Sequence, residues 1–255
     1  MEIAVLSSGS SGNSFYVQKN KSGILIDAGI SAKQISSRLK SLGINDEKVK
    51  GIFITHEHSD HISGVDVFAR RLQIPIFATK KTAENCFLCS QDNLINFIDN
   101  DSLLEIAGMK IEAFSKSHKA EDPVSYSISK GKKISVITDL GYACENVIER
   151  VSESDFLCLE ANHDIKMLQQ GPYPFFLKKW IKSDLGHLSN IQAALCVLEH
   201  GKSKLKNVIL SHISRNNNTP FIALKTFNSL IKERSDLKPL IMAPKHGEMT
   251  KLFKI

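Results

Sequence analysis

Long apolar runs are missing from this sequence. No apolar stretch in its 255 residues approaches the roughly 18–20 residues that a membrane-spanning helix needs. The first residues, MEIAVLSSGSSG, lack the basic segment and the longer apolar run of a secretory signal peptide. We therefore expect a cytoplasmic protein without membrane insertion.

Cysteines are few, and their pattern does not suggest a disulfide framework. The five are an odd and scattered set, which is typical of reduced thiols in the cytoplasm. Cys86 and Cys89 form a C-x-x-C pair, but no second pair completes a zinc site. Their helical spacing in ENCFLC predicts buried core thiols instead.

Acidic residues are outnumbered by basic ones, and linkers are absent. With 27 Asp and Glu against 33 Lys and Arg, the net charge is +6, which favours polyanionic partners such as nucleic acid. A content of 42% apolar and 24% charged residues excludes disorder, collagen and coiled coil. Because repeats, low-complexity tracts and Pro/Gly-rich linkers are missing, residues 1–255 are predicted to form a single domain.

Short β-branched runs alternate with amphipathic segments along the chain. The expected strands are residues 2–8, 14–18, 23–29, 49–56, 74–79, 109–115, 124–129, 132–139, 155–161 and 207–212. The expected helices are residues 30–43, 65–73, 81–89, 190–201 and 221–234. Strands mixed with helices throughout predict an α/β layered sandwich.

Five of the expected strands end in a side chain that can bind a metal or transfer a proton. These side chains are Asp27, His56, Asp139, Glu160 and His212. Buried strands deliver their terminal residues to one edge of a sheet, where loops assemble a site. Polar capping of strand ends explains one or two of these cases but not all five.

The strongest local signal is THEHSDH, which contains His56, His58, Asp60 and His61. Three histidines within six residues repel one another when protonated and pack poorly in a core when neutral. A metal ion gives neutral imidazoles and an ionised carboxylate a positive partner. The motif therefore predicts a metal centre.

The spacing in this motif favours two metal ions. A turn just past the strand can direct His56 and His58 at one ion, while Asp60 and His61 face the other way and can bind a second. Further ligands must come from other strand ends, namely His118, Asp139 and His212. The two oxygens of Asp139 suit a bridging position.

The ordered motifs LIDAG, THEHSDH, SKSH, VITDLG and LSH resemble those of the metallo-β-lactamase superfamily. The resemblance implies a four-layer αβ/βα sandwich of two mixed β-sheets flanked by helices, with a dinuclear site at one edge. It assigns His56, His58 and His118 to the first metal, and Asp60, His61 and His212 to the second, with Asp139 bridging them. It also implies that Asp27 orients the THEHSDH loop through hydrogen bonds, although a turn role for Asp27 stays open.

Further segments are similar to the YycJ/WalJ group of that superfamily. They are SSGSSGNSFYV, SHKAEDPVSYSI, LEANHD, YPFFLKKWIKSDLGHLSN and LSHISRNNN. This resemblance implies a bacterial metal-dependent nuclease with 5′-to-3′ exonuclease character. Lys119 stands where the group usually has Asp, which affects the entrance to the site and not the metal ligands.

GHLSNIQAA and LEANHD also resemble motifs of tRNA 3′-processing members of the fold. By that analogy His187, held by Glu160, is a general acid for the departing oxygen. The alternative is that His187 is a helix N-terminal residue that bonds to backbone, since LSN opens a helical segment. Asp60, beside its role as a ligand, completes the predicted catalytic set with His187 and Glu160.

Residues for substrate binding are less clearly marked. His163 in ANHD is a candidate for lining the site or binding substrate, and Asn216 and Asn217 after His212 are candidates for contacting phosphates, with a simple turn as the alternative. The aromatic and lysine residues of 173–182 are typical of single-strand nucleic acid binding. For most of them we favour the alternative of an amphipathic helix whose aromatics enter the core.

Together these features predict a metal-dependent phosphodiesterase or nuclease, a 5′-to-3′ exonuclease on DNA that uses a hydroxide activated by two metal ions. Its nitrogen and oxygen donors suit two divalent ions of Zn, Mn or Fe. The expected partner is nucleic acid as substrate, DNA in preference to RNA, and the sequence identifies no protein partner. Two alternatives stay open: a metallo-hydrolase of a small thioester, lactone, β-lactam or cyclic phosphodiester, and a non-catalytic metal-stabilised binding module.

Overall fold

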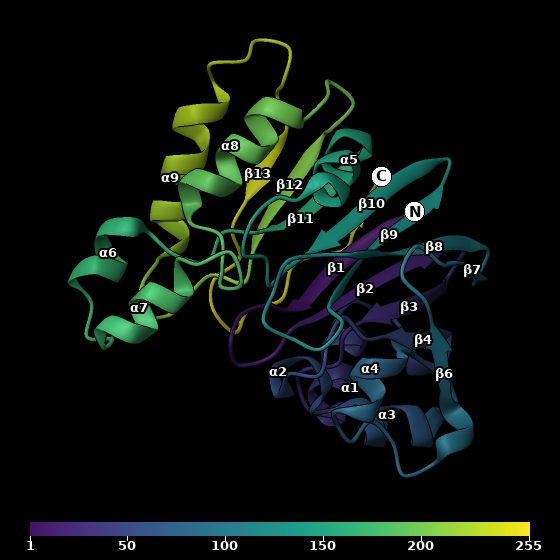
Figure 1. Ribbon diagram of the computed structural model, residues 1–255. Coiled ribbons are helices and arrows are strands. Elements are labelled where there is room, and N and C mark those ends of the chain that lie inside the picture. The colour runs from purple at the N-terminus through teal and green to yellow at the C-terminus, as the bar shows by residue number, and fades with distance from the viewer. The chain divides into compact units, whose positions relative to one another are not determined.

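A computed structural model describes residues 1–255, and its strands form two mixed sheets of seven strands each (Figure 1). Contacts group the chain into two units. Unit 1 comprises Met1–Ser115, Ala120–Gly131 and Gly247–Ile255, and unit 2 comprises Lys116–Lys119 and Lys132–His246. Unit 1 contains all of the first sheet and three strands of the second, and unit 2 contains the other four.

The first sheet has the strand order β14-β1-β2-β3-β4-β5-β6. Its strands are β1 (Glu2–Ser7), β2 (Ser14–Lys19), β3 (Ser22–Ile26), β4 (Val49–Phe53), β5 (Ile76–Thr79), β6 (Ile95–Ile98) and β14 (Phe253–Lys254). The pairs from β3 to β6 are parallel, whereas β1 pairs antiparallel with β2 and with β14. Parallel pairing directs the carboxyl ends of β3, β4 and β5 to the same edge.

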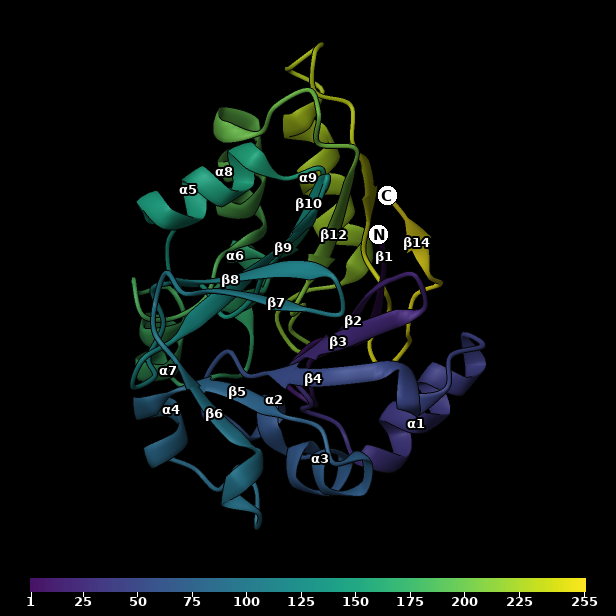
Figure 2. The same ribbon diagram turned by 90° about the vertical axis from the view of Figure 1, so that its right-hand side faces the viewer.

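Unit 1 also contains the antiparallel strands β7 (Leu103–Ile106), β8 (Met109–Ser115) and β9 (Val124–Lys130). Its helices are α1 (Ala32–Ser41), α2 (Ser59–Ile62), α3 (Val65–Leu72) and α4 (Lys80–Glu84), with 3₁₀ turns η1 (Asp46–Lys48) and η2 (Asp92–Leu94). Figure 2 shows α1 and α3 against one face of the first sheet. Their buried side chains, including Ile35, Leu39 and Phe68, pack in one core with Leu25 and Ile52 of that sheet.

Unit 2 is built on the parallel strands β10 (Lys132–Ile137), β11 (Phe156–Glu160), β12 (Asn207–Ser211) and β13 (Leu240–Met242). Its helices are α5 (Glu145–Glu153), α6 (Ile165–Gln170), α7 (Phe175–Ile181), α8 (Asn190–His200) and α9 (Pro220–Ile231). In Figure 1, α8 and α9 lie side by side on this part of the sheet. A capping box of Ser189 and Gln192 starts α8, and Pro220 starts α9. None of the helices is long and apolar enough to cross a membrane.

The helix expected over residues 81–89 is shorter in the structure than predicted. α4 ends at Glu84, and Asp66 then holds the following chain by accepting hydrogen bonds from the backbone N–H and the hydroxyl of Ser90. Cys89 is buried, as expected, but Cys86 is only half-buried. All ten expected strands are present, and the strands outside that set are β6, β7, β13 and β14, which are short and lie at the edges of the two sheets.

Candidate metal centre and catalytic site

Asp27 directly follows β3 and lies in the left-handed backbone region at φ +57°. Its carboxylate accepts hydrogen bonds from the backbone N–H of Thr55 at 2.8 Å and from the Thr55 hydroxyl at 2.9 Å. It also lies 2.7 Å from Nδ1 of His61. Since all three residues are buried, Asp27 fixes both the start of the THEHSDH loop and the orientation of the His61 ring.

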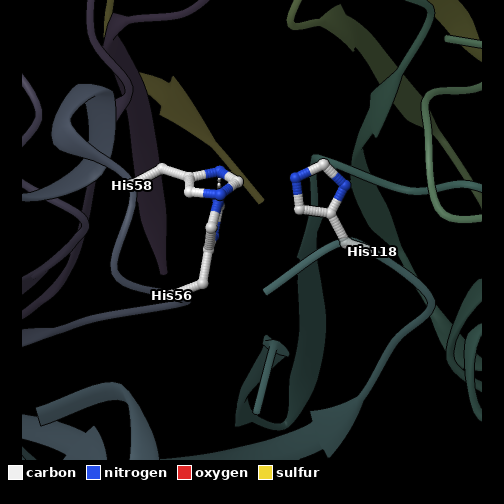
Figure 3. Close-up of side chains that lie close together, drawn as sticks. All are labelled: His56, His58 and His118. Carbon is white, nitrogen blue, oxygen red and sulfur yellow. Dashed lines mark hydrogen bonds between the residues drawn. The ribbon is translucent and has the colours of Figure 1, made fainter. Parts of the chain in front are cut away.

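The THEHSDH loop brings three imidazole rings together within unit 1. Nε2 of His56 lies 2.9 Å from Nδ1 of His58, and Figure 3 shows these two rings meeting at their nitrogens. The ring centroids of His56 and His61 are 4.1 Å apart. The loop then enters α2, whose N-cap is His58, so Asp60 and His61 stand on the first turn of a helix. This clustering suits neutral nitrogen donors, the form in which histidine binds a metal.

Asn13, which the sequence analysis did not single out, packs against the same loop. It is fully buried in the turn between β1 and β2, and its Nδ2 lies 3.3 Å from Oδ2 of Asp60 and 3.0 Å from Nε2 of His61. Its backbone N–H donates to the carbonyl of Asp60 at 2.7 Å. The only sequence signal for it is the conspicuous Gly/Ser-rich segment GSSGNS.

Gly29 permits this close approach of backbone segments. A Cβ added there would lie 1.7 Å from the carbonyl oxygen of Asp60. Real Cβ atoms do not approach backbone so closely, so any other residue would displace the loop.

Unit 2 holds a second cluster, made of Asp139, Glu160, His187 and His212, whose ligand atoms all lie within 4.8 Å of one another. Asp139 and His212 follow β10 and β12 and adopt positive φ values of +54° and +51°. Such backbone strain in non-glycine residues concentrates at functional sites. Imidazole and carboxylate are the donors that Zn²⁺ and related ions take, so the residues present fit a metal ion.

Glu160 is the hub of this cluster. One oxygen lies 2.7 Å from Nδ1 of His212 and 2.9 Å from Nδ1 of His187. The other accepts the backbone N–H groups of Leu140 at 2.8 Å and Leu188 at 3.0 Å. Burial raises the pKa of Glu160, but the two histidines outweigh that effect and hold the pKa below its ordinary value. The sequence analysis paired Glu160 with His187 but did not anticipate its contact with His212.

His187 lies in the loop between α7 and α8. Its backbone N–H donates to the carbonyl of Ile181 at 2.9 Å, and its ring meets that of Trp180 edge-on at a centroid distance of 5.6 Å. α8 begins at Asn190, so His187 precedes this helix, and its ring contacts Glu160 while its backbone N–H bonds to the Ile181 carbonyl.

His118, whose ring Figure 3 also draws, is held by the same loop of unit 2. Its Nδ1 lies 3.1 Å from the carbonyl of Gly186, and its Nε2 lies 3.9 Å from the carboxylate of Asp139. Burial lowers the pKa of His118 to about 3. The ring is therefore neutral at physiological pH, as a metal ligand must be.

The candidate substrate residues are placed in different surroundings. His163 is buried, and burial lowers its pKa to about 4. Asn217 is also buried, and its backbone bonds to Asp164 and Ser214, which favours a structural role. Asn216 is exposed and donates to the Tyr173 hydroxyl at 2.9 Å.

The favoured interpretation, that most aromatics of residues 173–182 enter the core, is wrong for the phenylalanines of α7. Phe175 is 81% exposed and Phe176 is 73% exposed, so neither enters the core. Only Trp180, which packs on His187, turns inward on this helix among the aromatics. The physical reason is that α7 is a short helix after Pro174 that buries Ile181 alone.

The fold and the donor clusters define a class of metal-dependent hydrolases. A family model described as a beta-lactamase superfamily domain matches residues 23–213, and the chain belongs to this superfamily. The chain is 39% identical to exodeoxyribonuclease WalJ of Streptococcus pneumoniae over 231 residues, covering 88% of this chain and 86% of that protein. It is 33% identical to exodeoxyribonuclease YycJ of Bacillus anthracis over 243 residues, covering 92% and 90%. The resemblance to the YycJ/WalJ group is thereby confirmed.

Solved structures confirm the fold class. The metallo-β-lactamase fold protein YhfI from Bacillus subtilis matches with a TM-score of 0.75 and 15% identity, covering 98% of each chain. The short form of human tRNase Z matches with a TM-score of 0.64 and 15% identity, again covering 98% of each chain. The chain is thus a metal-dependent hydrolase with the metallo-β-lactamase fold.

Proposed function

We propose that this protein is a nuclease that removes nucleotides from DNA in the 5′-to-3′ direction. The observation that carries the proposal is the Glu160 carboxylate, which holds His187 beside Asp139 and His212. The names of the two relatives, both called exodeoxyribonucleases, support DNA as the substrate. The positive net charge supports a polyanionic substrate.

The proposed centre contains two metal ions of Zn, Mn or Fe. The proposed ligands are His56, His58 and His118 for one ion, Asp60, His61 and His212 for the other, and Asp139 for both. When bound, such ions lower the pKa of water and stabilise negative charge on a phosphate. The buried Asp27 would keep His61 and Thr55 in place for this role.

In the proposed reaction, His187 donates a proton to the departing oxygen of the scissile phosphodiester. Glu160 orients the imidazole through Nδ1 at 2.9 Å, which leaves Nε2 as the atom that carries the transferred proton. The buried negative charge of Glu160 also stabilises the protonated ring. General acid catalysis of this kind contributes about 10²–10⁴-fold in rate.

The proposed setting is the bacterial cytoplasm. None of the five cysteines forms a disulfide, which suits a reducing compartment. The relatives WalJ and YycJ, which match over most of the chain, are also bacterial.

The test is digestion of end-labelled single- and double-stranded DNA and RNA with Mn²⁺, Zn²⁺ or a chelator. We expect stepwise shortening of DNA from a free 5′ end, and no cleavage with the chelator. Comparing a substrate blocked at its 5′ end with one blocked at its 3′ end determines the direction of digestion. Turnover of a thioester or β-lactam without cleavage of any nucleic acid would overturn the proposal in favour of a small-substrate hydrolase.

A further inference from the structure

The segment from α6 to the end of α7 has an unusual charge distribution. Residues 165–183 contain four lysines and no carboxylate, in a chain whose net charge is only +6. Two large aromatic side chains in the same segment, Phe175 and Phe176, project into solvent. Exposed aromatics among uncompensated cations call for a ligand that has both flat rings and negative charge.

Helical spacing places these groups on one surface. Lys178 and Lys179 lie three and four residues after Phe175, and Lys182 lies seven residues after it, so they share one face of α7 and its C-terminal turn. Together with Leu168 and Gln169 of α6 they line a pocket of about 290 Å³. Lys178 is fixed at its edge because its ammonium donates to the carbonyl of Gln169 at 2.8 Å.

The same helix is joined directly to His187. Trp180 packs edge-on against the His187 ring, and the Ile181 carbonyl accepts the His187 backbone N–H. The helix that carries the exposed phenylalanines and lysines therefore also helps to hold the proposed general acid in place.

We propose that Phe175, Phe176, Lys178, Lys179 and Lys182, here called the α7 platform, bind a single strand of nucleic acid on its way to His187. Bases stack on the two phenylalanine rings, and the lysines neutralise the phosphates between them. This inference rests on the proposed nuclease function and adds the binding surface for its substrate.

The test measures binding of a fluorescent phosphorothioate oligothymidylate of roughly 12 nucleotides, a length within the range of single-strand-binding surfaces. Fluorescence anisotropy is recorded with metal-loaded protein, since the phosphorothioate linkages resist cleavage. Phe175→Ala with Phe176→Ala should raise Kd about tenfold or more, because base stacking is lost. Phe→Leu replacements at both positions should lose nearly as much affinity as the alanine replacements, whereas Phe→Trp replacements should bind like the wild type.

The contribution of the lysines is measured through the salt dependence of binding. Lys178→Gln, Lys179→Gln and Lys182→Gln should each reduce the slope of log affinity against log salt by about 0.7, the value for one phosphate contact on a single strand. The matched control is Phe221→Ala on α9, since Phe221 is 73% exposed like Phe176. Its Kd should equal that of the wild type, and thermal melting should show all variants folded.

Two results would overturn the platform. One is an unchanged Kd in the Phe175→Ala, Phe176→Ala variant while the wild-type protein cleaves DNA, which sinks the platform but leaves the nuclease function standing. The other is full retention of affinity by the Phe→Leu replacements, which would show that base stacking on these rings does not contribute to binding. Failure of the wild-type protein to cleave any nucleic acid is a separate result, which overturns the proposed function.

Discussion

In unit 1 the histidines follow one strand within six residues, whereas in unit 2 Asp139, Glu160, His187 and His212 come from positions far apart in the chain. The loop of unit 1 is oriented by Asp27 and Asn13, neighbours outside the proposed ligand set. In unit 2 one buried carboxylate, Glu160, holds two histidines itself. Local sequence thus gathers the first cluster, and strand register gathers the second.

This comparison predicts that the charge of Asp139 matters more than any other single feature of unit 2. Asp139→Asn keeps a residue that tolerates positive φ but removes the anionic oxygen. We expect activity to fall below detection, and elemental analysis to find less metal per chain than the wild type.

Asp101→Asn is the matched control, because Asp101 is exposed and has φ +64°. It should keep full activity and metal content. Full metal content and activity in Asp139→Asn would remove Asp139 from the proposed ligand set.

The second prediction separates proton transfer from metal binding at the Glu160 hub. His187→Ala should lower the rate on DNA by about 10²–10⁴-fold while the metal content stays that of the wild type. The rate on a nitrophenyl phosphodiester, whose leaving group needs no proton, should fall much less. Adding Glu160→Gln should lower the rate further and also reduce metal content, because Glu160 holds His212, a proposed metal ligand, as well as His187.

His200→Ala serves as its control, since His200 lies at the far end of α8. Its kinetics should match the wild type on both substrates. Loss of metal in His187→Ala would make His187 a ligand and contradict the general acid role.

The third prediction concerns backbone approach in the loop of unit 1. Gly29→Ala should lower the free energy of unfolding by about 3 kcal/mol or more, because the new Cβ would meet the Asp60 carbonyl at 1.7 Å. Gly108→Ala, at φ +70° with open space around it, should cost only about 1–2 kcal/mol. Chemical denaturation measures both losses, and equal losses would contradict the close backbone approach at Gly29.

Much of both clusters could be predicted from the sequence because their residues stand at recognisable places. THEHSDH is dense in donors, and Asp139, Glu160 and His212 each close or follow an apolar strand. The role of Asn13 could not be predicted, because a buried amide in a Gly/Ser turn has the same sequence pattern as an exposed one. Its contacts with Asp60 and His61 arise from residues 47 and 48 positions away.

The surface of α7 was predicted wrongly for a different reason. Apolar residues at helical spacing normally indicate a buried face, and that rule assigned Phe175 and Phe176 to the core. A short helix at the periphery has little core to contact, so it can present aromatics to solvent. Hydrophobicity alone does not distinguish a core residue from a binding residue.

The smallest expected effect belongs to Asn13, the residue that supports the unit 1 cluster without a predicted ligand role. Asn13→Ala removes the amide that contacts Asp60 and His61 and the oxygen that accepts the Gly9 N–H at 2.9 Å. We expect the free energy of unfolding to fall by about 1–3 kcal/mol, the cost of leaving buried polar groups unpaired. Metal affinity should fall about tenfold, as is usual when a residue that orients ligands is removed.

Asn96→Ala on β6, where the amide contacts only the Leu94 carbonyl, should change neither quantity. Titration of chelator-treated protein with Zn²⁺ measures the affinity, and an unchanged affinity in a destabilised Asn13→Ala would show that Asn13 supports the fold alone.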